Sequence, residues 1–575
     1  MAIILRHLRP FIFTILFIIL LTFGQVIADL SLPNYLANIV NHGIAFHNIP
    51  FILRTGWIML IVSLLGITCA IYAGYLASRT ALGVGKGLRS SLFSHITNFS
   101  LSEFDQLGTS SLITRTTNDV QQIQTTTFML LRMMLRAPLM CIGGIVMAVR
   151  KDMGLSLILL SFFPVVIFIL FFVIRRAMPL FRQLQRRLDK INLVLRENLV
   201  GIRIVRAFGR VGFEKKRFWN ASSEFMDTSI SINRLMAILN PSMMLLMNLL
   251  TIAIVWFASF RIESGSLLIG DMLAFIQYAM QIFMSLMMLT MLFVLLPRAF
   301  ASAERIKEVL TVEHEITDAA SPVEMSGRRG FLTFDNVTFR YKGAERPAVC
   351  NVSFTACPGE VVAIIGGTGA GKSTLINLIP RYYDVEKGSI SIDGVDIRNI
   401  KQHDLRDRIG FVPQKAVIFS GTIEENIRLG RPGATSEEIT RACTIAQAAE
   451  FVEQLPKGYT SSIAQGGTNL SGGQKQRLSI ARAIVKKPEI YIFDDSFSAL
   501  DFKTDAALQA ALRGEIEGAT VLIVAQRVTS ILGATRILVM ENGTIVGNGT
   551  HKELLKTNEV YREIVESQLS NEEIG

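Results

Sequence analysis

Residues 361–379 read VVAIIGGTGAGKSTLINLI, and this stretch decides the fold of the second half of the chain. It matches GxxxxGK[ST] without a mismatch, between an apolar run and a helical pattern. Glycines let the backbone bend so that its N–H groups converge on phosphate oxygens at a helix N-terminus. We expect Lys372 to contact the β- and γ-phosphates of a nucleotide and Ser373 to bind Mg²⁺. The nucleotide-binding residues predicted here are Gly366, Gly367, Thr368, Gly369, Ala370, Gly371, Lys372, Ser373 and Thr374.

A second apolar run, IYIFD, ends in the carboxylate of Asp494. Mg²⁺ keeps several waters and uses few protein ligands, so we expect Asp494 to contribute to the metal site. Around these two motifs, short β-branched runs alternate with helical patterns, which predicts an α/β domain with buried strands. The predicted nucleotide-binding domain spans residues 331–575 and follows a polar linker at 311–330.

The first half of the chain is apolar. Hydrophobic residues make up 50% of the whole chain and charged residues 18%, whereas an ordinary soluble protein carries about 25% charged residues. A bilayer core takes about 20 apolar residues per helix. Six stretches of residues 1–310 meet that need and predict an all-α, six-helix transmembrane domain: about 11–40, 55–78, 127–149, 153–174, 235–260 and 272–297. Arg132 and Arg136 lie in the third stretch, where they either snorkel to an interface or face a wet cavity.

The basic residues give the orientation. The net charge is +11, but the basic residues crowd the ends and connectors of apolar stretches, which argues against a nucleic-acid partner. The connector after the fourth span is intensely basic, which predicts both termini in the cytoplasm and a multi-pass protein of the cytoplasmic membrane. The inner connectors, roughly 79–126 and 175–234, are long and amphipathic, so we expect helices that continue beyond the bilayer.

Two other features bear on the class of protein. The basic and apolar N-terminus is interpreted as an uncleaved first membrane helix, because the apolar run is long and lacks a small-residue cleavage site. Five scattered cysteines without metal-ligand spacing predict neither a metal cluster nor a disulfide framework.

Between the two nucleotide motifs lies LSGGQ, residues 470–474, and at this point the sequence resembles the ABC ATPases, whose signature it matches. Tyr341 resembles the aromatic residue that stacks on adenine, a contact that contributes about 1–3 kcal/mol. Gln414 is similar to the glutamine that senses Mg²⁺ and γ-phosphate, and Asp501 to the D-loop aspartate. With the six spans and long inner connectors, the resemblance covers essentially the whole chain. It implies a half-transporter of the ABC exporter type, with ATP and Mg²⁺ as cofactors.

The resemblance also implies a partner chain. In the family, two nucleotide-binding domains face head to tail, and the signature of each completes the site of the other. This chain has one such domain, so a second half-transporter is required. The residues that the resemblance assigns to the partner's ATP are Ser471, Gly472, Gly473 and Gln474.

Two catalytic positions depart from the family pattern. Efficient family members have a glutamate directly after the aspartate of the second apolar strand, where this chain has Asp495, and a histidine where it has Gln526. Asp is one methylene shorter than Glu, and a displacement of about 1 Å can cost about 100-fold in rate. Gln can donate a hydrogen bond to the γ-phosphate but cannot become a cation as His can.

Both changes weaken the same step, so the site on this chain's own P-loop is expected to bind ATP and hydrolyse it poorly. The pattern resembles the degenerate-site subunit of bacterial heterodimeric multidrug exporters, and it implies a partner that carries the glutamate and the histidine. Neutral drift in a homodimer is the alternative interpretation.

Candidate substrate contacts lie in the first and last spans. Flexible thioethers suit a surface that accepts many shapes, although methionines that pack between helices or face lipid fit the sequence equally well. A carboxylate within a span marks a pathway by default, either by attracting cationic compounds or by lying near the outer interface. The residues predicted to line the pathway of a small hydrophobic or amphipathic substrate are Asp29, Gln277, Gln281, Met284 and Met288.

Other functions are compatible with the same motifs. A homodimeric exporter of a lipid or a peptide, a nucleotide-regulated channel and an importer all use this architecture, whereas the predicted spans exclude a soluble ATPase. The sequence therefore predicts an ATPase coupled to transport, and export direction follows from the resemblance alone.

Overall fold

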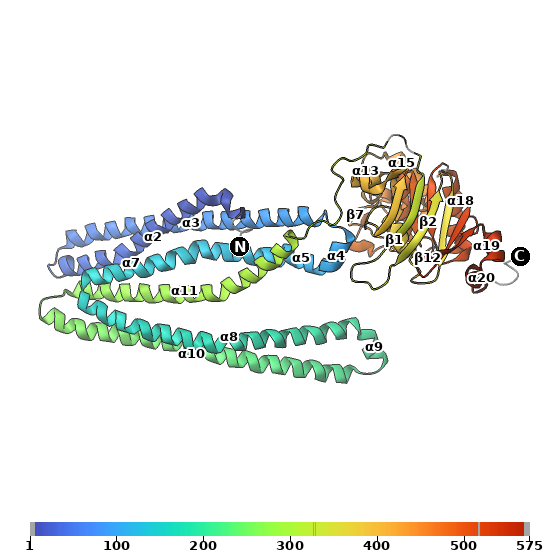
Figure 1. The fold of residues 1–575 in the computed structure, drawn as a ribbon. Helices are drawn as coiled ribbons and strands as arrows, with labels where there is room; N and C mark the ends of the chain where they lie inside the picture. The colour runs from blue at the N-terminus through green and yellow to red at the C-terminus, as the bar shows by residue number, and fades with distance from the viewer. Residues whose placement is uncertain (1–5, 326, 328, 516–517, 569–575) are drawn as a thin grey trace. The chain divides into compact units, whose positions relative to one another are not determined.

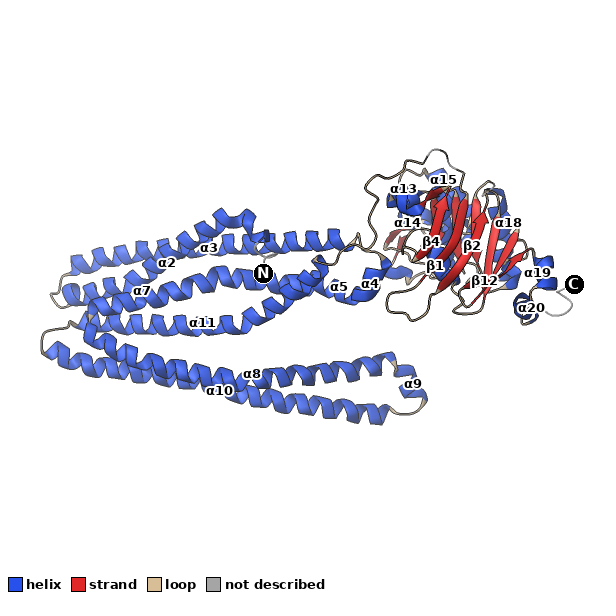
Figure 2. Ribbon diagram, viewed as in Figure 1, coloured by secondary structure: helices blue, strands red, loops and turns tan. Residues whose placement is uncertain are grey.

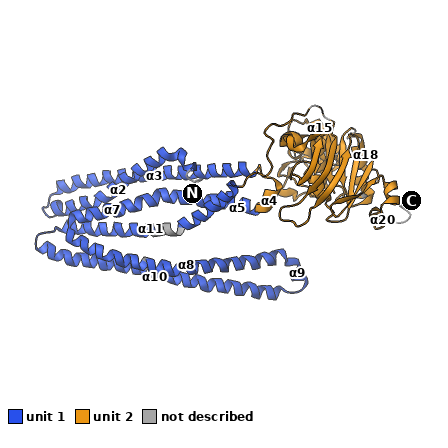
Figure 3. Ribbon diagram, viewed as in Figure 1, with its two compact units in different colours: residues 1–96, 110–311 blue, residues 97–109, 312–575 orange. Residues whose placement is uncertain are grey.

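The structure is a computed structural model that describes residues 6–325, 327, 329–515 and 518–568 (Figure 1). Its contacts divide the chain into two compact units, coloured separately in Figure 3. Unit 1 comprises residues 1–96 and 110–311, and unit 2 comprises residues 97–109 and 312–575. Figure 2 shows helices throughout unit 1 and strands in unit 2.

Unit 1 is built from long helices. Its elements are η1 (Arg9–Phe11), α2 (Ile12–Asn38), η2 (Ile39–Ile44), α3 (Ile49–Ile96), α5 (Thr109–Thr114), η3 (Arg115–Asp119), α6 (Val120–Met129), η4 (Leu130–Met134), α7 (Leu135–Lys151), α8 (Met153–Val200), α9 (Ile202–Ala207), α10 (Val211–Glu263) and α11 (Ile269–Leu310). Within the described residues, six helices are long and apolar enough to cross a membrane: Arg6–Ile44, Ile49–Ile96, Thr109–Lys151, Met153–Val200, Val211–Glu263 and Ile269–Leu289. The prediction of six membrane helices is confirmed.

Three helix pairs organise unit 1. Helix α2 packs against α3, α7 against α11, and α8 against α10. Figure 1 shows α8 and α10 as one long hairpin closed by α9. An ion pair joins α7 to α11, with Lys151 Nζ 2.7 Å from Asp271 Oδ1. On the other hairpin, Lys190 Nζ lies 3.0 Å from Glu224 Oε2.

Each inner connector contains a short helix that the sequence does not predict. A capping box between Ser100 and Glu103 begins α4 (Leu101–Leu107), and Gly108 ends it with a φ of +74°. Only glycine adopts such a backbone conformation readily, so the chain turns there. Residues 97–109 belong to unit 2, where the backbone N–H of Glu315 donates to Glu103 Oε1 at 2.6 Å.

Unit 2 contains two main sheets. An antiparallel sheet has the order β2 (Val349–Ala356), β1 (Leu332–Phe339), β4 (Lys387–Ile392) and β5 (Val395–Asp396), and β7 (Gly421–Thr422) pairs with β8 (Ser462–Ile463). A six-stranded sheet has the order β12 (Thr544–Gly549), β11 (Arg536–Glu541), β3 (Val361–Gly366), β10 (Thr520–Val524), β9 (Ile490–Asp494) and β6 (Ile409–Val412).

In the six-stranded sheet, all neighbours are parallel except β11 and β12. Strand β9 is buried along its whole length, as expected for a parallel strand covered on both faces. The helices of unit 2 are α12 (Lys372–Leu378), η5 (Ile397–Asn399), α13 (Gln402–Asp407), α14 (Ile423–Arg428), α15 (Ser436–Ile445), α16 (Ala449–Glu453), η6 (Gly458–Thr460), η7 (Gln465–Gly467), α17 (Gly472–Lys486), α18 (Phe502–Glu515), η8 (Val528–Ser530), α19 (His551–Thr557) and α20 (Glu559–Glu566). The predicted α/β domain is therefore confirmed.

A buried arginine connects the two main sheets. Arg408 Nη1 lies 3.0 Å from Glu489 Oε2, beside β9, and 3.4 Å from Asp393 Oδ2, in the turn between β4 and β5. The three side chains are only 9–13% exposed. Arg408 therefore supplies positive charge to two carboxylates that belong to different sheets.

We therefore predict that Arg408→Ala lowers the thermal unfolding midpoint of the purified chain, because breaking a buried ion pair costs about 3–5 kcal/mol. The control is Arg441→Ala. Arg441 pairs with Glu515 through a side chain that is 69% exposed, so about 0–1 kcal/mol is expected. Equal midpoints for the two variants would contradict this role of Arg408.

Candidate functional site

The loop between β3 and α12 has the backbone that the glycine-rich motif predicts. Gly369 and Gly371 have φ values of +83° and +95°. A Cβ atom on Gly371 would also collide with the carbonyl oxygen of Ala348. Glycine is therefore required at position 371 by both backbone angle and space.

The ammonium of Lys372 lies inside this loop. Its Nζ donates to the carbonyl oxygens of Gly366 and Gly367, at 2.8 and 2.7 Å. Burial lowers the pKa of Lys372, and the nearby carboxylates of Asp495 and Asp494 oppose that shift. The loop thus holds a partly desolvated cation where the motif places phosphate oxygens.

Ser373 and Asp494 form a pair of oxygen ligands. Ser373 Oγ donates to Asp494 Oδ1 at 3.0 Å, and burial raises the pKa of Asp494. Two adjacent ligands of an octahedral Mg²⁺, each bound at about 2.1 Å, lie about 3 Å apart. The observed spacing fits one Mg²⁺ ion shared by the hydroxyl and the carboxylate, both of which are hard oxygen donors.

Asp495 contacts the loop that follows β6. Gln414 Nε2 donates to Asp495 Oδ2 at 3.2 Å. Asp495 is 8% exposed and has a φ of +45°, which aspartate tolerates better than most residues. The structure therefore brings together four of the predicted elements: the P-loop, Asp494, Asp495 and Gln414.

Tyr341 lies beside the P-loop helix. Its hydroxyl is 3.1 Å from Thr374 Oγ1, and its ring packs edge-on against Tyr383 with centroids 5.4 Å apart. A cavity of about 660 Å³ is lined by Tyr341, Tyr383 and residues of α4. There is thus room beside the ring that the sequence assigns to adenine.

The signature residues lie at the start of α17. Ser471 caps the helix: its Oγ accepts from the backbone N–H of Gln474 at 3.3 Å, and Gln474 Oε1 accepts from the N–H of Ser471. Ser471 and Gly472 are exposed. Within the described residues, the side-chain hydrogen bonds of Ser471 stay inside this turn, and none of them reaches the P-loop. Asp501 bonds to the backbone and hydroxyl of Thr504, which lowers its pKa.

Gln526 follows β10, and a residue that the sequence analysis missed holds its backbone. Gln568 Nε2 donates to the carbonyl oxygen of Gln526 at 2.8 Å, and Gln568 Oε1 accepts from the N–H of Val528 at 2.9 Å. The side chain of Gln526 is exposed. No motif or periodicity marks Gln568, because its role depends on the fold alone.

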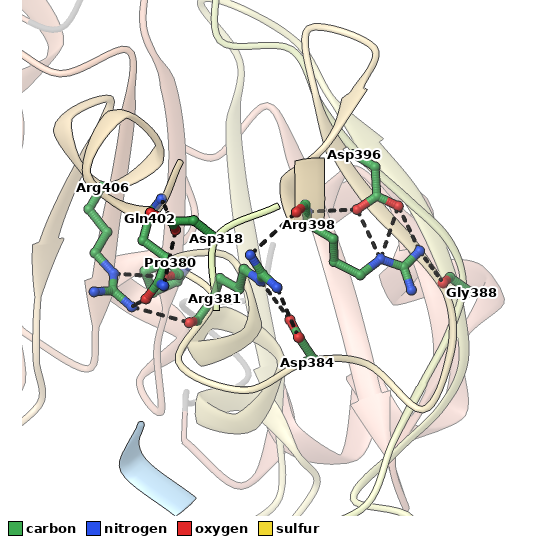
Figure 4. Close-up of polar contacts among 9 residues, drawn as sticks. All are labelled: Asp318, Pro380, Arg381, Asp384, Gly388, Asp396, Arg398, Gln402 and Arg406. Carbon is green, nitrogen blue, oxygen red and sulfur yellow. Dashed lines mark hydrogen bonds and ion pairs between the residues drawn. The ribbon is translucent and has the colours of Figure 1, made fainter. Parts of the chain in front are cut away.

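A polar network fixes the turn that follows α12 (Figure 4). Arg406 donates to the carbonyl oxygens of Pro380 and Arg381, at 3.2 and 3.3 Å. Arg381 pairs with Asp384 at 2.7 Å. The backbone N–H of Gln402 donates to Asp318, which lies in the stretch that the sequence predicts as a linker. These contacts hold the end of the P-loop helix in place.

The predicted substrate residues gather at a second cavity, in unit 1. Its volume is about 420 Å³, and its walls come from α7 and α11. Four of the five predicted residues line it. The complete lining is Arg136, Ala137, Met140, Gln277, Met280, Gln281, Met284, Ser285 and Met288.

Asp29 does not line the cavity but contacts two residues that do. Arg136 Nη2 lies 3.1 Å from Asp29 Oδ2, and Gln281 Nε2 donates to the backbone oxygen of Asp29 at 3.2 Å. The sequence allows Arg136 either to snorkel to an interface or to face a cavity. In the structure its side chain lines the cavity. A carboxylate already paired with a guanidinium is a weaker attractant for cations than the sequence suggests.

Comparisons with known proteins agree along the whole chain. The family described as the ABC transporter transmembrane region matches residues 15–286, and the family described as ABC transporter matches residues 349–498. An uncharacterised ABC transporter ATP-binding protein of Mycobacterium tuberculosis is 40% identical over 579 residues, which cover 100% of this chain and 99% of the relative.

A Bacillus subtilis protein, provisionally named a multidrug export ATP-binding/permease protein, is 33% identical over 87% of this chain and 86% of its own length. The solved structure of a bacterial Atm1-family ABC exporter with ATP bound superimposes with a TM-score of 0.79 and 26% identity. The match covers 98% of this chain and 99% of that chain.

Lys372→Ala is predicted to weaken ATP retention at this chain's own site by about 10- to 100-fold, because hydrogen bonds to charged groups contribute about 1.5–3 kcal/mol. The measurement is radiolabelled ATP that remains bound to the purified protein with Mg²⁺. Lys552→Ala, at an exposed lysine on α19, is the matched control. Retention unchanged in Lys372→Ala would refute the P-loop assignment.

Gln568→Ala should accelerate hydrogen exchange at Val528 by about fivefold, since one lost hydrogen bond contributes about 1 kcal/mol. Gln568→Glu keeps the acceptor for Val528 and is expected to exchange more slowly than Gln568→Ala. ATP retention is expected to stay the same in both variants. Equal exchange in wild type and Gln568→Ala would show that Gln568 does not hold this loop.

Proposed function

Because this chain belongs to the ABC transporter family, we propose that it is one half of a two-chain exporter that uses ATP to move hydrophobic or amphipathic compounds across the cytoplasmic membrane. Its fold is that of the family's exporters, and its nucleotide domain belongs to a family that binds ATP with Mg²⁺. The observation that carries the finer proposal is the pair Asp495 and Gln526, next to an intact signature.

The chain's own residues are suited to binding ATP. In this proposal, the P-loop backbone and Lys372 bind the phosphates, Tyr341 stacks on adenine, and Ser373 with Asp494 holds Mg²⁺. A bound Mg²⁺ neutralises phosphate charge and orients the phosphate oxygens. Gln414 would contact the metal and the γ-phosphate when ATP arrives. Its hydrogen bond to Asp495, the residue after Asp494, supports this role.

Hydrolysis at this site is proposed to be slow. A general base must lie within hydrogen-bond reach of the attacking water, and Asp495 draws its carboxylate back by one methylene relative to glutamate. The carboxylate also accepts a hydrogen bond from Gln414. Gln526, in the place of histidine, offers no cation to the γ-phosphate.

The signature is proposed to serve the partner's ATP. Ser471 and Gly472 are exposed at the N-terminus of α17, where helix N–H groups favour an anion. A partner that carries the missing glutamate and histidine would then hydrolyse ATP against this signature. The two chains would form a heterodimer with one strong site and one weak site.

Transport follows from the closure of the two nucleotide domains. ATP must bind the closed state more tightly than the open state for this closure to shift the population. The helices that continue from the spans would transmit closure to the membrane unit. The basic connectors support a cytoplasmic location for both termini in this proposal.

The decisive experiment measures the steady-state ATPase activity of the assembled heterodimer. Asp495→Asn is expected to retain more than about half of the activity, because the other site dominates. Replacement of the partner's glutamate is expected to reduce the activity at least about 100-fold, since general-base catalysis contributes about 10²–10⁴-fold. Ser471→Ala is also expected to reduce the ATPase activity, because in this proposal Ser471 belongs to the partner's site.

Thr435→Ala provides the matched control for Ser471. Thr435 is also exposed and caps α15 with a capping box, so both variants lose a helix cap worth about 1 kcal/mol. Only Ser471→Ala should reduce ATPase activity. If Asp495→Asn abolishes ATPase activity and Ser471→Ala retains it, then the efficient site is this chain's own and the assignment of the two sites is wrong. Full transport by this chain alone would refute the heterodimer.

A further inference from the structure

The cavity of unit 1 combines an apolar wall with one cation. Four of its nine lining residues are methionines of α7 and α11, and Met280 and Met284 are 55% and 61% exposed. Arg136 is the one charged side chain among its lining residues. Such a wall fits an apolar body of variable shape, and the guanidinium adds one site for a polar group.

Among the described residues, Arg136 uses one of its nitrogen atoms for a side-chain hydrogen bond. A guanidinium has five N–H donors, and Nη2 is the atom that contacts Asp29. The side chains of Arg136 and Asp29 remain 34% and 28% exposed. An acidic group in the cavity can therefore bind Arg136 without first displacing Asp29.

The local charge favours an anion. Arg132 lies four residues before Arg136, in the π-helical segment η4, and its Nη1 donates to the backbone oxygen of Ala70 at 2.7 Å. Two arginines and one aspartate leave a net charge of +1 among these three residues. Charge within a span is costly, so an anionic ligand reduces that cost and a cationic ligand increases it.

A second polar group lies beside the arginine. Within the described residues, Gln281 Oε1 is buried and has no hydrogen-bond partner, while its Nε2 is occupied by the backbone oxygen of Asp29. A buried acceptor without a partner is costly. The O–H of a singly protonated phosphate would satisfy it, whereas an ionised carboxylate has no donor to offer.

We propose that this cavity binds amphiphiles with an anionic headgroup, which contacts Arg136 while the apolar body lies along the methionines. This inference rests on the proposed transport function and names the class of substrate. The anionic group has two sources, a carboxylate as in a fatty acid or a phosphate as in a lipid headgroup. Both groups offer two oxygen atoms that share negative charge, and a guanidinium can bind such a pair bidentately.

The test compares ligands with identical tails. The purified transporter, in nanodiscs of zwitterionic lipid without ATP, is titrated with dodecanoate, dodecyl phosphate and dodecyltrimethylammonium. The two anions are expected to bind at least about tenfold more tightly than the cation. Tighter binding of dodecyl phosphate than of dodecanoate would identify phosphate as the source, and the reverse order would identify carboxylate.

Three variants locate the headgroup. Arg136→Gln is expected to reduce the preference for anions to below about threefold, and Arg136→Lys is expected to retain it. Asp29→Asn is expected to strengthen anion binding, because it removes the competing carboxylate. Arg217→Gln, at an arginine of α10 that pairs with Glu197, is the matched control and is expected to leave the preference unchanged.

Equal binding of anions and cation by the wild type would overturn the proposal, as would an anion preference that survives in Arg136→Gln. The wild-type comparison needs no variant, so a variant that fails to fold leaves the proposal testable. Because binding is measured without ATP, its failure is distinct from failure of the proposed function. Anion binding with no ATP-driven transport would instead refute that function and leave the cavity assignment standing.

Discussion

The parallel register of β3, β10, β9 and β6 is the constraint on which the nucleotide domain depends. Val524 at the end of β10 pairs with Ile364 of β3 on one side and with Asp494 of β9 on the other. Parallel strands present their carboxyl ends at one edge of the sheet, where ligands of such folds bind. Asp494 is the last residue of β9, and the P-loop, Asp495, Gln414 and Gln526 each follow one of these strands. A slip of one residue in β9 would turn Asp494 to the other face of the sheet.

The membrane unit obeys a different constraint, because a charge in an apolar medium needs a partner. Asp29 has Arg136, and Lys151 has Asp271. The pair at 29 and 136 joins α2 to α7, and the pair at 151 and 271 joins α7 to α11. Each of these two pairs joins two helices, and the pair at 29 and 136 also contributes a cation to the cavity beside it.

Sequence reasoning succeeded where the signal is local. Long apolar stretches predicted six membrane helices, and apolar runs beside GGTGAGKS and Asp494 predicted buried strands that appear as β3 and β9. The roles of the motif residues rest on family resemblance and stay predictions, although their geometry fits them.

The sequence could not reveal contacts between distant residues. Arg136 and Asp29 are 107 residues apart, and Gln568 and Gln526 are 42 apart. Nothing in spacing or periodicity indicates that either pair meets. The sequence suggests that Asp29 attracts cations only because it does not reveal the pairing of Asp29 with Arg136. The grouping of residues 97–109 with unit 2 depends on α4, a helix of seven residues that is too short to be predicted from a sequence pattern. These features arise from tertiary packing, which local propensity does not encode.

A short chain of contacts joins this chain's own site to the signature that is proposed to serve the partner. Asp495 accepts from Gln414, and the carbonyl oxygen of the preceding residue, Pro413, accepts from Gln476 at 3.2 Å. Gln476 is 2% exposed and lies in α17, the helix that Ser471 caps. The loop beside the aspartates and the start of α17 are therefore held as one piece. If ATP turns over slowly at this site, the contacts of Gln414 change rarely, and α17 is presented to the partner's ATP in a constant position. In the proposed heterodimer, slow hydrolysis on this side would then support fast hydrolysis on the other, which would give a physical reason for an altered catalytic pair and an intact signature to occur in one chain.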